Sequence, residues 1–252
     1  MDVFLEHANE WTASSILDRV AVAMPLQSNS LEELIAEVAL LKDRGIRHVG
    51  VRRQQVFRIG QSILCEVLDD AGIAINSLGF AGGFTGALGI SYWDATDDVR
   101  RAADLAAALR ARFLVVVPGG QGLHTYNHAE RTVRMGFSDV LYYADQRNLR
   151  LLVPTDTVLG CLRDVFQARG STLNWVEQMG TTTIRPLIVI RGSSSAFRLP
   201  RGWRESLAAG GCLRICDRCT HYEQNLQLLT GVLSFLGRRC EVAPPGLRCF
   251  VG

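Results

Sequence analysis

The sequence predicts a single α/β domain, residues 1–252, in which parallel strands alternate with helices and close into a (β/α)8 barrel. Short β-branched runs alternate with longer amphipathic stretches along the chain, and eight such runs occur. A length of 252 residues matches the roughly 250 residues that this architecture typically needs. With 48% hydrophobic and 21% charged residues, the composition is that of a globular chain and excludes a disordered or coiled-coil protein.

The first five strands are predicted from short apolar runs that end at glycine, proline or a polar residue. Their ranges are 19–24, 48–53, 74–80, 113–120 and 149–156. Amphipathic spacing predicts the helices between them, at residues 31–45, 59–72, 97–111 and 128–148.

The remaining strands are predicted at residues 185–192, 212–218 and 246–252. Between them, one or two helices broken near Gly170 are predicted over residues 158–179, with further helices at 201–211 and 225–237. Because no regular helix follows the last strand, we expect the N-terminal segment, residues 1–18, to cover the open side of the barrel. A doubly wound open sheet is the alternative, but eight strands and the lack of a Gly-x-Gly-x-x-Gly fingerprint disfavour it.

Charge and hydropathy narrow the functional classes. The formal net charge is only +2, which argues against a protein that coats nucleic acid. The strongest apolar run, Phe113 to Val117, is far shorter than the roughly 20 residues of a membrane span. An N-terminus rich in acids, and seven scattered cysteines, favour a reduced, cytoplasmic protein with no membrane partner.

Several stretches resemble the xylose-isomerase-like sugar-phosphate isomerase/epimerase superfamily, whose members are TIM barrels. GIRHVGVRRQQVFRIG is similar to the second strand and its turn, with Arg53 on the family's arginine and Arg52 in place of an aromatic residue. INSLGFAGGFTG resembles the third strand and its loop, LAAALRARFLVVVPGG the third helix and fourth strand, and NLRLLVPTD the fifth strand. The likeness extends from about Arg19 to Val153.

The resemblance implies a divalent metal site that this chain does not reproduce. The family holds its metal with a glutamate on strand five, an aspartate on strand six, a histidine on strand seven and a glutamate on strand eight. The corresponding residues here are Pro154, Arg191, Arg214 and Phe250. Proline offers no ligand atom, and an arginine about 4 Å from a divalent ion costs roughly 8 kcal/mol at an effective dielectric of 20. We therefore expect no metal and no other cofactor.

Two interpretations of the arginines remain open. Period-two alternation groups Arg53 with Val49 and Val51, Arg191 with Leu187 and Val189, and Arg214 with Cys216, each set facing into the barrel. In the first interpretation the arginines, with Asp217, form a substrate-binding site for a phosphate or carboxylate. In the second they pair with Asp156 and Asp217 and only fill the mouth of the barrel, which is the opening at the carboxyl ends of its strands.

Other candidates carry weaker signals. His124, in a glycine-bearing loop after strand four, and Asp156, after strand five, are the candidate catalytic acid and base. Lys42, the only lysine among the 27 basic residues, lies on an amphipathic helix, which disfavours lysine-based catalysis. The residues Cys212, Cys216, Cys219 and His221 suggest zinc, but strand cysteines without a second pair are more simply barrel packing.

Three functions follow from this reading. The first is a metal-free relative of sugar isomerases that binds a small ligand: a sugar, a sugar phosphate or a carboxylate. The second is an active isomerase or epimerase that uses Asp156 and His124. The third is a non-catalytic scaffold or assembly subunit, and assembly as a homo-oligomer is left open.

Overall fold

The computed structural model describes residues 21–43, 45–154, 172–191, 212–216 and 248–251. Eight parallel strands form a closed barrel in sequence order, which confirms the predicted fold class. They are β1 (Ala21–Pro25), β2 (His48–Arg52), β3 (Ala74–Gly82), β4 (Phe113–Val117), β5 (Arg150–Pro154), β6 (Ile184–Arg191), β7 (Cys212–Cys216) and β8 (Arg248–Val251). The barrel closes where β8 pairs with β1.

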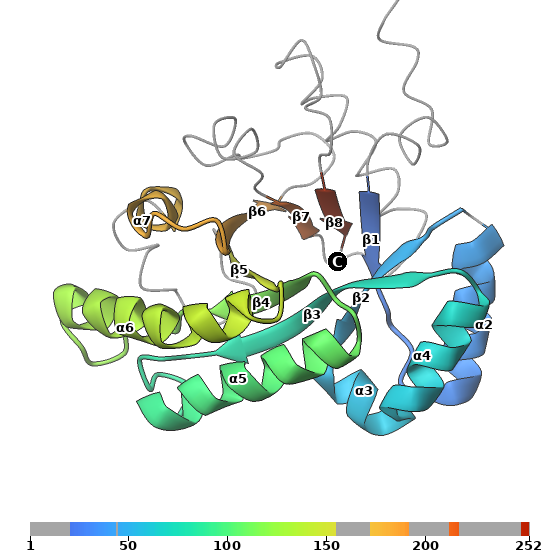
Figure 1. Cartoon of the computed structure of the whole chain (residues 1–252), viewed down its shortest axis with the longest axis horizontal. Helices are drawn as coiled ribbons and strands as arrows, with labels where there is room; N and C mark the ends of the chain where they lie inside the picture. Colours follow the sequence, from blue (N-terminus) through green and yellow to red (C-terminus); the bar gives the residue numbers. More distant parts are fainter. Residues whose placement is uncertain (1–20, 44, 155–171, 192–211, 217–247, 252) are drawn as a thin grey trace, which may run out of the picture.

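The described helices pack on the outside of β2 to β6 (Figure 1). They are α2 (Leu31–Asp43), α3 (Arg53–Ile59), α4 (Gln61–Asp70), α5 (Tyr92–Ala108), α6 (Tyr126–Asp145) and α7 (Thr172–Gln178). The predicted helices at 201–211 and 225–237, and the N-terminal segment 1–18, lie outside the described residues. Helix α3 was not predicted, because its seven residues follow β2 without any intervening turn residue.

Helix α5 begins five residues earlier than predicted. Ser91 lies before its first turn in an extended conformation, and its hydroxyl accepts a hydrogen bond from the Asp94 backbone N–H at 3.1 Å. This contact satisfies one of the free N–H groups at the start of the helix. Tyr92 and Trp93 therefore belong to the first turn of α5 rather than to the loop before it.

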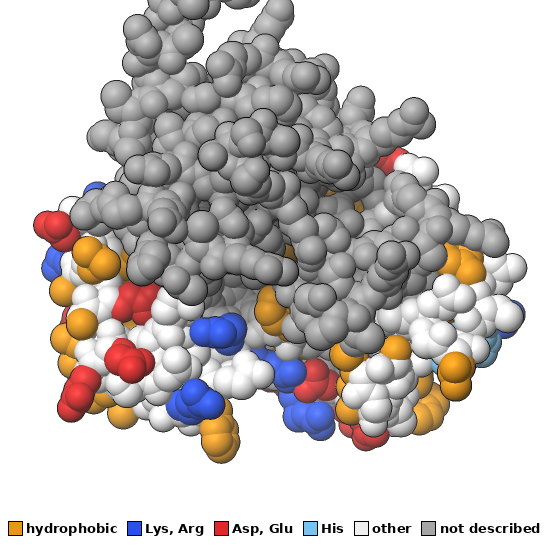
Figure 2. Space-filling view, turned by 180° about the vertical axis from the view of Figure 1, so that it is seen from behind, with side chains coloured by type: hydrophobic (Ala, Val, Ile, Leu, Met, Phe, Trp, Pro, Cys, Tyr) orange, Lys and Arg blue, Asp and Glu red, His pale blue; other side chains and the backbone are white. Residues whose placement is uncertain are grey.

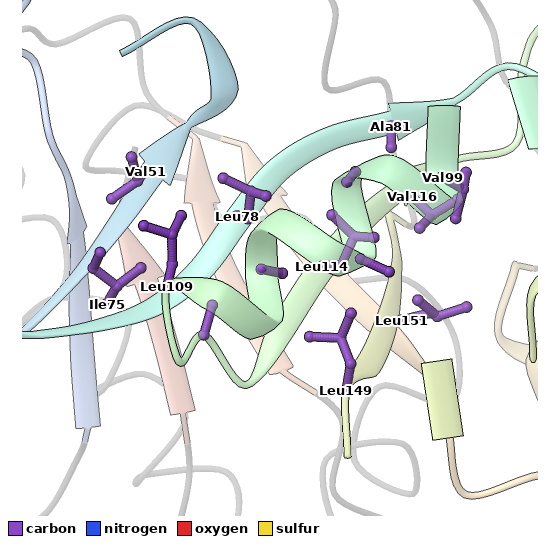
Figure 3. Close-up of a cluster of buried hydrophobic side chains, with 14 of the residues drawn as sticks. Val51, Ile75, Leu78, Ala81, Val99, Leu109, Leu114, Val116, Leu149 and Leu151 are labelled. Atoms are coloured by element: carbon purple, nitrogen blue, oxygen red, sulfur yellow. The ribbon is translucent and has the colours of Figure 1, made fainter. Parts of the chain in front are cut away.

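The larger hydrophobic core lies between the strands and the helices. Alternate strand residues, including Val51, Leu78 and Leu114, point outward toward Val99 and Leu109 at α5 (Figure 3). Because successive side chains on a strand face opposite sides, β2, β4 and β5 contribute every second residue to this layer. This core holds the barrel and its helices together.

A smaller set of strand residues forms a second cluster inside the barrel. Phe113, Val115, Leu152 and Leu187 are all buried there, and Phe80 packs against them. They come from β3, β4, β5 and β6, and alternate along their strands with members of the outer core. The barrel interior is therefore packed on this side, as is usual for a (β/α)8 barrel.

The described surface carries charges of both signs. Acidic and basic side chains are interspersed over the described part of the face in Figure 2, in keeping with the small net charge. None of the described helices combines the length and the apolar character that crossing a bilayer requires.

Candidate functional site at the carboxyl ends of the strands

Loops at the carboxyl ends of β3 and β4 form one hydrogen-bonded unit. The Gly83 and Phe84 backbone N–H groups donate to the carbonyls of Val117 and Pro118, at 2.8 and 3.0 Å. The buried Thr85 hydroxyl donates to the Gly120 carbonyl at 2.6 Å. In barrels of this kind the loops at this end carry the functional site, so this unit forms one wall of the candidate site.

Close approach at Gly119 requires a glycine there. Its φ is +107°, and a Cβ atom would lie 2.5 Å from the Thr85 hydroxyl oxygen. A larger residue would push the two loops apart and strain the backbone.

His124 is fixed against this wall. Its Nε2 lies 3.0 Å from the Thr85 carbonyl oxygen, and its ring centroid lies 4.8 Å from that of His128. A carbonyl oxygen can only accept, so Nε2 carries the hydrogen of this bond. In the neutral ring the lone pair then belongs to Nδ1, which is the atom that could accept a proton.

Arg53 does not lie where its predicted alternation places it. Val49 and Val51 pack against the helices rather than into the barrel, and Arg53 is the first residue of α3. Its guanidinium forms two hydrogen bonds to the Asp98 carboxylate of α5, at 2.6 and 2.9 Å. The prediction that Arg53 faces the barrel interior is therefore wrong, because the strand face that carries Val49 and Val51 points to the helices and the strand ends at Arg52.

Arg52 occupies the place predicted for Arg53. Along β2 it alternates with the outward-facing Val49 and Val51, and it pairs in register with Gly79 of β3. Its side chain is exposed, and no carboxylate within the described ranges lies at ion-pair distance from it. Sequence reasoning missed this residue by one position in the strand register.

A buried amide connects Arg52 to the loop after β1. The Gln55 Nε2 donates to the carbonyls of Leu26 and Ser28, at 2.7 and 2.9 Å, and its Oε1 accepts from the Arg52 backbone N–H at 2.9 Å. Gln55 is only 1% exposed. The ends of β1 and β2 are therefore held together by one side chain.

Ser28 has an unsatisfied hydroxyl in this region. The residue is 4% exposed, and its Oγ has no hydrogen-bond partner among the described residues. Its backbone N–H, by contrast, donates to the Glu37 carboxylate at 2.9 Å. Leaving a buried polar group without a partner costs about 1–3 kcal/mol, so this hydroxyl is a candidate hydrogen-bonding group for a ligand.

Comparison with known proteins extends this picture. No protein-family model matches the chain, and no curated protein is similar enough to match it. Solved structures do match. A protein of Sinorhizobium meliloti 1021 is 24% identical over 86% of this chain and 83% of its own, with a TM-score of 0.60. The 3-keto-D-glucoside 4-epimerase of Escherichia coli is 8% identical over 92% of each chain, with a TM-score of 0.63.

A D-allulose 3-epimerase from Methylomonas sp., solved in complex with D-allulose, is 12% identical over 92% of this chain and 83% of its own, with a TM-score of 0.63. A xylose isomerase-like TIM barrel fused to a 4-hydroxyphenylpyruvate dioxygenase matches with a TM-score of 0.60. The chain has the xylose-isomerase-like TIM-barrel fold.

In this xylose-isomerase-like barrel, the strand ends implied to hold a metal carry other residues. Pro154, a buried residue without a ligand atom, ends β5, and Arg191 ends β6. Arg214 of β7 pairs in register with Val189 of β6 and Phe250 of β8. Among the described residues, no group of three or more metal-ligating side chains is found.

The structure does not describe several of the predicted site residues of this xylose-isomerase-like barrel. Asp156, Asp217, Cys219 and His221 lie outside the described residues. The backbone positions of Arg191 and Arg214 are described in β6 and β7. The described part of the site thus comprises the loops after β1, β3 and β4, the end of β2, and His124.

Proposed function

We propose that this barrel binds a small, negatively charged sugar-like ligand at the carboxyl ends of its strands, without a divalent metal. The observation that carries the proposal is the set of residues at three neighbouring strands: Pro154, Arg191 and Arg214 stand where the family resemblance implies metal ligands. Cationic guanidinium groups favour an oxyanion and repel a cation.

Two further observations support a ligand that is sugar-like and negatively charged. The similar solved structures include proteins named as epimerases of D-allulose, L-ribulose and a keto-glucoside. The period-two alternation that places Leu187 inside the barrel predicts the same face for Arg191, and the register from Leu187 to Cys212 predicts it for Arg214. Asp217, directly after β7, is proposed to accept a hydrogen bond from a hydroxyl group of the ligand.

The proposal is tested by thermal unfolding with a panel of phosphorylated sugars and sugar acids. We expect at least one compound to raise the Tm of the wild type, and to have no effect on an Arg191→Ala, Arg214→Ala double variant. A double variant of two exposed helix arginines, Arg101→Ala and Arg131→Ala, should respond like the wild type. The absence of a shift with every compound would favour the scaffold function instead.

A second candidate function is metal-independent isomerisation or epimerisation with His124 and Asp156 as acid and base. The specific observation in its favour is the fixed His124 ring, whose Nδ1 keeps a lone pair while Nε2–H is bonded to Thr85. A general base must be held within hydrogen-bonding reach of the proton it removes, and this ring is held by the site wall.

His124→Gln separates the two roles of this ring. The glutamine amide nitrogen can replace Nε2 in the bond to Thr85, but glutamine has no equivalent of Nδ1. We expect chelator-insensitive turnover of D-allulose or a related ketose by the wild type, and a loss of about 100-fold or more in His124→Gln with unchanged Tm. Turnover that disappears with chelator, or that survives in His124→Gln, would contradict this function.

A further inference from the structure

Arg52 is the last residue of β2, and its side chain is exposed. It alternates with Val49 and Val51 of the outer core, while the adjacent Arg53 is bound to Asp98. Arg52 itself makes no ion pair within the described ranges. A guanidinium offers several N–H donors in one plane and matches a carboxylate or phosphate well.

The strand residue beside Arg52 carries no side chain. The register partner of Arg52 in β3 is Gly79, where a Cβ atom would contact no described atom within 4 Å. The space at Gly50 of β2, by contrast, is filled by Ser77, whose hydroxyl oxygen would lie 2.9 Å from a Cβ atom there. The next residue of β3, Phe80, packs on the apolar cluster inside the barrel and offers a nonpolar surface.

Ser28 supplies a second polar group at the neighbouring strand end. Its hydroxyl is buried and lacks a hydrogen-bond partner among the described residues. Gln55 binds the Ser28 carbonyl and the Arg52 backbone N–H at the same time, each at 2.9 Å. The backbones of the two residues are therefore held in a fixed relation by the fold before any ligand arrives.

We propose that Arg52 and Ser28, positioned by Gln55, form an oxyanion subsite at the ends of β1 and β2. Arg52 would bind the phosphate or carboxylate group of a ligand through paired N–H donors, and the Ser28 hydroxyl would donate a further hydrogen bond. The rest of the ligand would lie toward Gly79 and Phe80. This inference rests on the proposed ligand-binding function and adds to Arg191 and Arg214 a second anion-binding contact, at the ends of β1 and β2.

The test is isothermal titration calorimetry of the full chain with four probes: inorganic phosphate, D-ribose 5-phosphate, D-gluconate and uncharged D-ribose. D-Ribose 5-phosphate carries a phosphate and D-gluconate a carboxylate, so comparing these two probes shows which oxyanion the site prefers. Inorganic phosphate tests the anion without a sugar, and D-ribose tests the sugar without an anion. The variants are Arg52→Gln, Arg52→Lys and Ser28→Ala, with Arg101→Gln as the control for loss of an exposed arginine on α5.

We expect a charged probe to bind the wild type, with an affinity that falls about tenfold or more in Arg52→Gln and about threefold to tenfold in Ser28→Ala. Arg52→Lys should show an intermediate loss, because an ammonium keeps the charge but not the paired donors. Arg101→Gln should match the wild type. Circular dichroism and the unliganded Tm establish that each variant is folded.

The outcomes separate this subsite from the broader proposal. Equal binding of a charged sugar by the wild type and Arg52→Gln overturns the subsite and leaves the proposed function standing. Binding of inorganic phosphate that depends on Arg52, with no sugar bound, supports the subsite and contradicts the proposed function. If no probe binds the wild type, both are overturned.

Discussion

Adjacent arginines at the end of β2 have opposite environments. Arg53 and Asp98 retain 30% and 22% of their side-chain exposure and form a bidentate pair that joins α3 to α5. Arg52, one residue earlier, is exposed at the mouth. Because neighbouring strand residues face opposite sides, a shift of one residue decides whether an arginine stabilises the fold or is available to a ligand.

The Arg53–Asp98 pair is expected to contribute measurably to stability. In a double-mutant cycle of Arg53→Ala and Asp98→Ala, urea unfolding should give a coupling free energy of about 1 kcal/mol, reduced by added salt. Partial exposure screens the charges, whereas the bidentate geometry favours the pair. The neighbouring pair Arg100–Asp97, a single exposed contact at 3.3 Å, is the control and should couple more weakly. A larger coupling in the control pair would contradict this expectation.

The phenol of Tyr92 is expected to lose its proton only at unusually high pH. Burial, followed by its hydrogen bond to the Asp139 carboxylate at 2.5 Å, raises the pKa of its phenol from 10 to about 12. Because the folded pKa lies above the unfolded one, the stabilisation is complete below pH 10 and is lost as pH rises toward 12.

Ultraviolet titration of tyrosinate checks this prediction. Tyr92→Phe should remove part of the absorbance change that the wild type shows at the highest pH, and Asp139→Asn should move that part to lower pH. A late component of the same size in Tyr92→Phe would show that Tyr92 ionises normally.

Among the elements, strands were the easiest to predict. Phe113–Val117 is apolar on both faces, since its residues alternate between the interior cluster and the outer core. Helix α3 could not be predicted, because Arg53–Ile59 is too short for a clear amphipathic period and no residue type marks the end of β2. Nothing in the sequence indicates that the face of Val49 and Val51 points to the helices rather than into the barrel, and assigning that face to the interior exchanged the roles of Arg52 and Arg53.

The wall formed by the loops after β3 and β4 depends on Thr85. In Thr85→Val the side chain keeps its shape but cannot donate to the Gly120 carbonyl, so we expect a loss of about 1–2 kcal/mol in unfolding free energy. Hydrogen exchange should become faster in residues 83–91 and 118–125. Thr85→Ser keeps the hydroxyl and should retain most of the protection. Unchanged exchange in Thr85→Val would mean that the backbone contacts alone hold the loops.

Helix α6 packs closely through Gly136. A Cβ atom there would lie 2.4 Å from the ring of Phe84, a buried residue of the loop after β3. Although alanine favours helices, Gly136→Ala should therefore lower the unfolding free energy by about 1–3 kcal/mol through overpacking. Ser138→Ala, at an exposed position of the same helix, should be neutral or stabilising. Increased stability of Gly136→Ala in chemical denaturation would contradict this packing argument.

At the scale of the whole molecule, alternating strands and helices were enough to predict a closed barrel, whereas the site was predictable only in part. His124 was selected because it follows a strand, and it does lie at the carboxyl ends of the strands. Its bond to Thr85 joins residues 39 positions apart, and no local pattern predicts such a contact. The same holds for Gln55, whose contacts with Leu26 and Ser28 are evident only once β1 and β2 are adjacent.

The identity of the strand-end residues leads to a prediction about the entire barrel. A ligand that binds only the folded state stabilises it, by about 4 kcal/mol when its concentration is 1,000 times its Kd. A xylose-isomerase-like barrel with an intact divalent site should therefore unfold at a higher temperature when Mn²⁺ or Mg²⁺ is added. In this chain Pro154 offers no donor at β5, and Arg191 and Arg214 would repel a cation at β6 and β7.

We expect calorimetry of this chain to give the same Tm with Mn²⁺, with Mg²⁺ and with chelator. These two ions are the appropriate probes because they prefer oxygen ligands and bind poorly to the seven cysteines. A rise in Tm with either ion, abolished by chelator, would mean that carboxylates from other positions have rebuilt the site.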